Sequence, residues 1–217
     1  MHKAIRSGKF KFNSSLVTYL NPQSEIAEQY RTIRNNVRFA SGQERAGTIV
    51  VTSPAVGDGK TVAAVSLSIS MAQRGDRVLL IDTHVKRPML HHIFNLQVSP
   101  GLRDVLVKQV ELQEAVHKTD IRNLSILPCG QNLLYVSDLL DTEAMSVLLE
   151  QSLKQYDVVL LDSSPVVGSA DACALASKCD GAILVVNGGK TQMQSALEAK
   201  RLLELGKVKV LGAILNN

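Results

Sequence analysis

The sequence predicts an α/β fold in which a mostly parallel central β-sheet is covered by helices on both faces. Two observations predict it: short aliphatic runs alternate with helical patterns, and the hydrophobic content is almost entirely aliphatic. The 217 residues are 45% hydrophobic but 4% aromatic, with no Trp. Uninterrupted aliphatic runs are typical of parallel strands buried on both faces. The length suits one sizeable core rather than two.

The first predicted element is an amphipathic helix over residues 24–38. Ile26, Tyr30, Ile33 and Val37 recur at helical spacing and form one apolar stripe. Ser24 is the expected N-cap, and the Ser-Gly pair at 41–42 marks the exit. This helix is an N-terminal extension of the α/β core, which we place at residues 42–217.

The remaining elements alternate along the chain. Strands are expected at residues 48–52, 77–82, 124–127, 157–162, 181–187 and 208–215. Helices are expected at residues 60–74, 143–156, 170–177 and 191–205, and an amphipathic helix covering the core at residues 101–119. This alternation predicts a parallel sheet. Three cysteines without metal or redox spacing, Cys129, Cys173 and Cys179, are expected to be reduced and buried.

Residues 1–23 form a basic arm. Between Met1 and Ser24 the chain carries no acidic residue and five side chains that are basic or His: His2, Lys3, Arg6, Lys9 and Lys11. Contact with an anionic membrane surface, at about 1 kcal/mol per Lys or Arg, and a solvated tail both remain open. The net charge of +4 is too small to indicate a nucleic-acid protein. No specific nucleic acid is expected, and no signal peptide or membrane span, which predicts a cytoplasmic protein.

A phosphate-binding loop is predicted between the strand at 48–52 and the helix at 60–74. Gly57 and Gly59 allow several backbone N–H groups to turn toward a phosphate, and the helix start adds its positive dipole. Lys60 is expected to reach the β- and γ-phosphates of ATP, and the Thr61 hydroxyl to ligate Mg²⁺. The strict pattern has Gly at position 54, where this chain has Pro.

Two carboxylates follow predicted strands. Asp82 ends the run at 78–81 and Asp162 ends the run at 158–161. Open α/β sheets bind ligands at this carboxyl edge. Asp162 suits a Walker B role at Mg²⁺, and Asp82 is placed to polarise an attacking hydroxyl or water.

These motifs resemble the bacterial tyrosine kinases, a P-loop family tied to capsule and exopolysaccharide production. Four segments carry the resemblance over about residues 20–217: the loop at 53–61, Leu-Leu-Ile-Asp-Thr-His at 79–84, Leu-Leu-Asp-Ser-Ser-Pro at 160–165, and Glu28-x-x-Arg31-x-x-Arg34. The resemblance implies transfer of the γ-phosphoryl of ATP to tyrosine, with Lys60 and Asp82 catalytic and Thr61 and Asp162 at Mg²⁺. It implies the ATP-binding set Gly57, Asp58, Gly59, Lys60, Thr61, Val62 and Asn216, the last at the adenine.

The resemblance also implies partners. Glu28, Arg31 and Arg34 on the helix at 24–41 match the motif used for ring oligomerisation in the family. We also expect a transmembrane activator and protein substrates that carry tyrosine. Through that activator, the protein would be held at the inner face of the membrane. From spacing alone, Glu28 and Arg31 would make only an exposed intrahelical pair.

Two departures from the family pattern bear on activity. His84 stands where the second motif usually has a second Asp, and a neutral imidazole is a poor ligand for Mg²⁺. We therefore expect His84 to spare nucleotide binding and to slow transfer, although a protonated His84 touching phosphate is an alternative. The family's C-terminal tyrosine cluster is also absent: the tyrosines Tyr19, Tyr30, Tyr135 and Tyr156 are scattered. Such a tail was either removed or never present.

Two weaker signals and two alternative functions stay open. The pair His91-His92 has no ligand partner at metal spacing, and the Lys-Arg-Pro segment at 86–88 suits either a phosphate or subunit contact or an exposed helix start. The alternative functions are a nucleotide-binding regulator, which His84 favours, and a positioning ATPase that places DNA or septum proteins. The latter usually has an additional Lys early in its phosphate loop, and this chain has none there.

Overall fold

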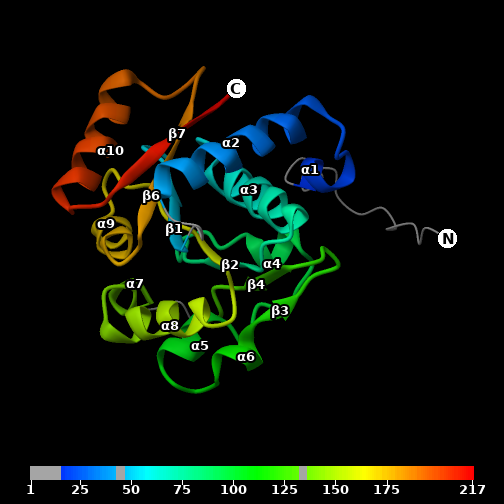
Figure 1. Ribbon diagram of the computed structural model, residues 1–217. Coiled ribbons are helices and arrows are strands. Elements are labelled where there is room, and N and C mark those ends of the chain that lie inside the picture. The colour runs from blue at the N-terminus through cyan, green and yellow to red at the C-terminus, as the bar shows by residue number, and fades with distance from the viewer. Residues whose placement is uncertain (1–15, 43–46, 132–135) are drawn as a thin grey trace.

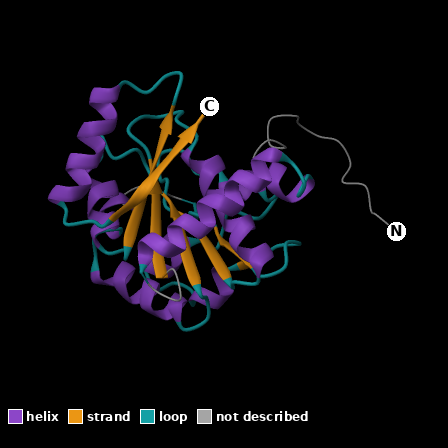
Figure 2. Cartoon of the chain, turned by 45° about the horizontal axis from the view of Figure 1, so that its top comes forward, coloured by secondary structure: helices purple, strands orange, loops and turns teal. Residues whose placement is uncertain are grey.

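A computed structural model describes residues 16–42, 47–131 and 136–217, and within them the predicted α/β fold is confirmed. The described residues form one sheet in the strand order β3-β4-β2-β5-β1-β6-β7, in which all pairs are parallel except β3 with β4. Its strands are β1 (Gly47–Thr52), β2 (Val78–Asp82), β3 (His117–Lys118), β4 (Leu124–Leu127), β5 (Val158–Asp162), β6 (Gly181–Asn187) and β7 (Val210–Asn216). Figure 2 shows this sheet between two layers of helices.

The helices divide between the two faces of the sheet (Figure 1). They are α1 (Val17–Leu20), α2 (Glu25–Ser41), α3 (Lys60–Arg74), α4 (Leu90–Ile93), α5 (Leu102–Leu106), α6 (Leu112–Ala115), α7 (Val136–Leu139), α8 (Glu143–Leu153), α9 (Ala170–Ser177) and α10 (Met193–Leu205). Buried side chains of α2, α3 and α4 pack on one face, and those of α5, α6, α8, α9 and α10 pack on the other.

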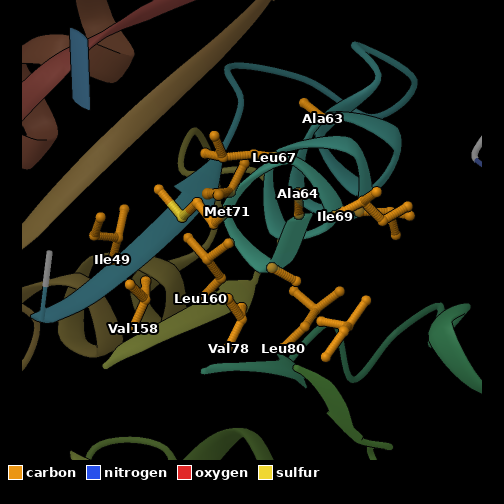
Figure 3. Close-up of a cluster of buried hydrophobic side chains, with 14 of the residues drawn as sticks. Ile49, Ala63, Ala64, Leu67, Ile69, Met71, Val78, Leu80, Val158 and Leu160 are labelled. Carbon is orange, nitrogen blue, oxygen red and sulfur yellow. The ribbon is translucent and has the colours of Figure 1, made fainter. Parts of the chain in front are cut away.

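The alternating side chains of the central strands supply both halves of the core. Ile49 and Val51 of β1 face α3, whereas Val50 between them faces the opposite layer. Figure 3 shows the α3 side, where Leu67 and Met71 lie over strands β1, β2 and β5. Because the central strands are buried on both faces, their sequences are continuously aliphatic, as the sequence pattern predicted.

Helix α2 packs against α3 and β7 and extends three residues beyond the predicted end. The Ser24 hydroxyl accepts the N–H of Ala27, and Gly42 ends the helix with a left-handed φ of 71°. The predicted apolar stripe is wrong at one position: Ile26 is 44% exposed, and the adjacent Ala27 is buried instead.

The single helix predicted at residues 101–119 is wrong. This segment contains α5, α6 and the short strand β3. Lys108 adopts a left-handed φ of 58°, which ends the first helix, and β3 then pairs antiparallel with β4. Leu102 and Leu106 still cover the core, so the expected burial is confirmed although the expected helix is not.

Other sequence expectations concern the ends and the cysteines. The basic arm at 1–23 lies mainly outside the described residues, as does Tyr135. Within the part of the chain that the structure describes, no helix is both long and apolar enough to cross a membrane. The three cysteines are free thiols; Cys129 is buried, whereas Cys173 and Cys179 are half-buried.

Candidate nucleotide-binding site

The carboxyl ends of β1, β2 and β5 meet at one edge of the sheet. In the strand register Asp82 of β2 lies opposite Asp162 of β5, which in turn lies opposite Val51 of β1. Strand β1 then leads directly into the loop at 53–59 and helix α3. The structure therefore brings together the loop and the two carboxylates that the sequence singled out, as expected for the ligand edge of an open α/β sheet.

The loop turns through two left-handed glycines. Gly57 has a φ of 91° and Gly59 a φ of 93°, values that strain any residue with a β-carbon. Gly59 is also the N-cap of α3, so this helix begins without a side chain capping its N–H groups. The first N–H groups of a helix, together with its dipole, form a site for an anion such as phosphate.

Lys60 is the first residue of α3 and is 5% exposed. Burial lowers the pKa of its ammonium, and the nearby carboxylates of Asp162, Asp58 and Asp82 act in the opposite direction. These carboxylates favour the charged form, which is the form that binds phosphate.

Asp162 is fully buried, and neither of its carboxylate oxygens has a hydrogen-bond partner. The pKa of Asp162 is raised to about 7, chiefly by burial and in part by the nearby Asp82, while Lys60 acts in the opposite direction. Thr61 stabilises the charged form slightly, although its hydroxyl does not reach hydrogen-bond geometry. A buried carboxylate without partners is costly unless a cation completes it. Asp162 and the Thr61 hydroxyl therefore fit Mg²⁺, a hard cation that prefers oxygen ligands.

Asp82 is also buried, but its oxygens are partly occupied. One oxygen, Oδ2, accepts the N–H groups of Met89 and Leu90 at 2.9 and 3.0 Å, which fixes the start of α4. The other, Oδ1, accepts only the N–H of His84 at 3.2 Å and retains capacity for a hydroxyl donor. The pKa of Asp82 is raised to about 6, because the effect of burial exceeds the opposing effects of the three N–H groups and Lys60.

His84 lies beside this pair of carboxylates, 5% exposed, with its Nδ1 atom buried and without a hydrogen-bond partner. Burial, assisted by Lys60, Arg87 and Lys86, lowers its pKa to about 4. In the nucleotide-free protein the imidazole is therefore neutral near pH 7, which favours the interpretation of His84 as a neutral side chain over a protonated one at phosphate.

A residue that the sequence did not single out holds the phosphate loop. The Thr191 hydroxyl donates to Asp58 Oδ1 at 2.9 Å, and the Ala55 N–H donates to Asp58 Oδ2 at 2.8 Å. The Asp58 side chain is thus engaged within the protein. Lys190, next to Thr191, places its Nζ 3.5 Å from the Val56 carbonyl oxygen.

Asn216, expected near the adenine, lies against the same loop. Its Nδ2 donates to the Asp58 carbonyl at 3.0 Å, and a β-carbon at Gly59 would collide with its side chain. Thr83 is a second contributor that the sequence did not identify. Its N–H and hydroxyl both donate to the Asp162 carbonyl, at 2.9 and 2.8 Å, and they lock the ends of β2 and β5 together.

The charged motif of α2 lies away from this loop. Arg31 forms an intrahelical salt bridge with Glu28 and donates to the Pro22 carbonyl at 2.9 Å. Arg34 donates to the Ser70 carbonyl of α3 at 2.8 Å, so it anchors α2 to the core. Glu28 and Arg31 are the more exposed members of the motif.

The structure adds little support for a functional role of His91 and His92 or of the segment at 86–88. The rings of His91 and His92 lie 3.9 Å apart, between centroids. Within residues 16–42, 47–131 and 136–217, no three His, Cys, Asp or Glu side chains are grouped to hold a metal by themselves. Lys86 and Arg87 are exposed in the turn before α4. That position agrees with either of their two interpretations.

Comparisons with known proteins agree with this geometry. The family model described as an AAA domain matches residues 46–204. The chain is 35% identical to the tyrosine-protein kinase YwqD of Bacillus subtilis, over 95% of this chain and 87% of that one. It is 28% identical to the putative tyrosine-protein kinase CapB of Staphylococcus aureus, over 94% and 89%.

Solved structures give the same result. The kinase domain of the Escherichia coli tyrosine kinase ETK superposes with a TM-score of 0.90 at 26% identity, covering 99% of this chain and 82% of that one. The chimerical protein CapA2B2 superposes with a TM-score of 0.86 at 32% identity, covering 94% and 89%. The chain belongs to the bacterial tyrosine-protein kinases, a family built on the P-loop ATPase fold.

Proposed function

We propose that this protein transfers the γ-phosphoryl group of ATP to tyrosine hydroxyls and thereby regulates capsule or exopolysaccharide production. The observation that carries the proposal is the convergence of Lys60, Asp82 and Asp162 beside a phosphate loop, with the Asp162 carboxylate buried and without a partner. The kinase names of relatives that match almost the whole chain support it.

Each residue has a defined task in this reaction. The loop N–H groups of residues 57–62 and the Lys60 ammonium hold the phosphates, while Thr61 and Asp162 hold Mg²⁺, which neutralises phosphate charge when bound. Asp82 accepts the proton of the tyrosine hydroxyl at Oδ1. The tyrosine oxygen bonds to the γ-phosphorus, the bond from that phosphorus to the β,γ-bridging oxygen breaks, and ADP leaves. The raised pKa of Asp82, about 6, suits a group that takes up a proton near neutral pH.

The fate of labelled γ-phosphate from ATP tests the proposal against its alternatives. We expect label on tyrosine when a peptide from a candidate membrane activator is added. Release of free phosphate without transfer would instead indicate a positioning ATPase, and binding without either would indicate a nucleotide-binding regulator. The second candidate, the regulator, is favoured by one observation: a neutral, buried His84 beside the proposed metal position.

We further propose that Glu28, Arg31 and Arg34 on the helix at 24–41 contribute to a ring of like subunits, with residues 42–217 as the kinase domain. A transmembrane activator would hold this ring at the inner face of the membrane. Some relatives are much longer: the chain is 31% identical to the tyrosine-protein kinase ptk of Acinetobacter johnsonii but covers 28% of its length. The rest of that protein has room for a further domain.

Replacing His84 by Asp tests the role assigned to this position. In His84→Asp we expect faster Mg²⁺-dependent transfer, because a third carboxylate next to Asp82 and Asp162 suits a hard cation better than a neutral imidazole. Nucleotide affinity should change little. Autophosphorylation rates and ADP titrations at several Mg²⁺ concentrations measure this, with His92→Asp as the control. An unchanged rate of transfer would refute the role of His84.

Two arginine substitutions separate assembly from stability. Arg31→Ala should shift the protein toward smaller species in sedimentation velocity with little change in unfolding free energy, since the ion pair with Glu28 and the hydrogen bond to the Pro22 carbonyl that it removes are both exposed. Arg34→Ala should cost about 1–2 kcal/mol of unfolding free energy, because it removes the hydrogen bond to the Ser70 carbonyl. If wild-type protein and Arg31→Ala sediment identically as oligomers, Arg31 has no part in the assembly.

A further inference from the structure

We propose that Thr191 and Asp58 are positioning residues of the nucleotide site. Their side chains tie the phosphate loop to the loop at 187–191 and hold it, before nucleotide arrives, in the shape that receives phosphates. The inference rests on the proposed nucleotide binding and goes beyond it, because it assigns the affinity of the site partly to a loop that follows a different strand.

The tie is a part-buried hydrogen bond to a carboxylate. Asp58 is 1% exposed, and its two oxygens accept from two different segments: Oδ2 from the Ala55 N–H within the loop, and Oδ1 from the Thr191 hydroxyl of the loop after β6. Hydrogen bonds to a carboxylate are stronger than those between neutral groups, and more so when water is excluded. This one joins residues that are 133 positions apart in the sequence.

The far side of the tie is itself rigid. The Thr191 hydroxyl accepts the Asn187 N–H at 3.0 Å, so its single proton is directed to Asp58. The turn is closed by the Thr191 N–H on the Asn187 carbonyl at 2.9 Å and by the Gly189 N–H on Asn187 Oδ1 at 3.1 Å. Asn187 ends strand β6, which pairs with β1, so the anchor belongs to the sheet rather than to a free loop.

Asp58 also receives a second tie, on its backbone. Asn216 at the end of β7 donates to the Asp58 carbonyl at 3.0 Å and fills the space beside Gly59. The ends of β6 and β7 therefore both converge on the residue between the two left-handed glycines. This is the part of the loop whose N–H groups would face phosphate, and its glycines lose the most conformational freedom when they are ordered.

The consequence concerns binding energy. If the protein orders this segment in advance, nucleotide binding does not have to do so, and affinity is correspondingly higher. Without the Thr191 hydroxyl, part of the ordering cost falls on nucleotide binding. The binding of the ground state and the binding of the transition state are weakened by the same free energy. The KM for ATP should therefore rise while kcat stays nearly constant.

The test compares Thr191→Val, which removes the hydroxyl at almost constant shape, with Thr191→Ser, which keeps it. We expect the Kd for Mg·ADP and the KM for ATP to rise about tenfold in Thr191→Val, with kcat within about twofold of wild type. Thr191→Ser should stay close to wild type. The matched control is Thr142→Val, which loses a comparable hydroxyl bond, to the Leu139 carbonyl at 2.7 Å, before helix α8. Its Kd should not change.

Calorimetric titration with Mg·ADP on variants shown to be folded by circular dichroism provides the readout. Failure of wild-type protein to bind Mg·ADP would refute the proposed nucleotide site itself. If wild type binds and Thr191→Val binds equally well, or if Thr191→Ser loses as much affinity as Thr191→Val, the positioning role is overturned. Asp58→Ala combined with Thr191→Val should be no weaker than Asp58→Ala alone, because the first change already removes the acceptor of the Thr191 hydroxyl.

Discussion

Lys60→Met should lose at least about 100-fold in the rate of phosphoryl transfer, the size expected when one preorganised charge is removed from the transition state. Lys60 is buried at the first position of α3, next to the phosphate loop and the free N–H groups at the start of the helix. Methionine keeps the length of the side chain and removes its charge. Nucleotide binding should weaken less than transfer, because charge accumulates on the phosphoryl oxygens mainly in the transition state.

Single-turnover transfer from labelled ATP measures this effect. Lys200→Met is the matched control, since Lys200 lies on α10 with its side chain 56% exposed and pairs with Glu204 at 3.5 Å. That variant should transfer at the wild-type rate. Transfer by Lys60→Met above about a tenth of the wild-type rate would mean that another group carries the charge at the phosphate, contrary to the assignment.

Asp162→Asn should abolish Mg²⁺-dependent transfer and, at the same time, stabilise the nucleotide-free protein. Both effects come from the same feature, a buried carboxylate with no hydrogen-bond partner. The amide cannot supply the charge that Mg²⁺ requires, so transfer should fall at least about 100-fold. The amide also removes the cost of burying an ionised group without its cation.

The stabilising effect has a defined pH dependence. Burial raises the pKa of Asp162 from about 4 in the unfolded chain to about 7, so between these values the folded protein binds more protons than the unfolded one. Stability of the wild type therefore falls as pH rises through this interval, and the loss is complete above pH 7. The Asp162→Asn variant does not lose stability in this way, because its amide does not titrate. Its advantage should be small near pH 5 and largest near pH 8, on the order of a few kcal/mol.

Urea unfolding of both proteins at pH 5 and pH 8, without nucleotide or metal, measures the difference. Asp141→Asn is the control, because the Asp141 side chain is 69% exposed and should show no such pH-dependent gain. An Asp162→Asn variant less stable than wild type at pH 8 would show that this carboxylate has a favourable partner in the folded protein.

The order of strands and helices was largely predictable because buried parallel strands are aliphatic without interruption. The run at 78–81 and the run at 158–161 each mark a strand, and both end in the Asp that lies at the ligand edge. The prediction of one helix at residues 101–119 was wrong because the apolar spacing there reflects the burial of Leu102 and Leu106, not a continuous helix. The left-handed turn at Lys108 has no local signal, since Lys has no preference for that conformation.

The site residues likewise fall into those that the sequence predicted and those that only the structure identified. Lys60, Asp82 and Asp162 were found because each occupies a fixed place relative to a strand end or a glycine loop. Thr191 was not found, since its role depends on a contact with Asp58 between the loops that follow two neighbouring strands, β1 and β6, and no local pattern encodes that contact. The conclusion that His84 is neutral also required the structure, because its pKa is lowered by burial and by the nearby charges of Lys60, Arg87 and Lys86.

Phosphoamino-acid analysis of the product from labelled ATP tests the central claim most directly. With Mg²⁺, an activator peptide and a tyrosine-containing substrate polymer, wild-type protein should place the label on tyrosine, and chelation of Mg²⁺ should prevent it. Label on tyrosine that persists in Asp82→Asn at the wild-type rate would contradict the mechanism. Label that appears only as free phosphate would contradict the kinase itself.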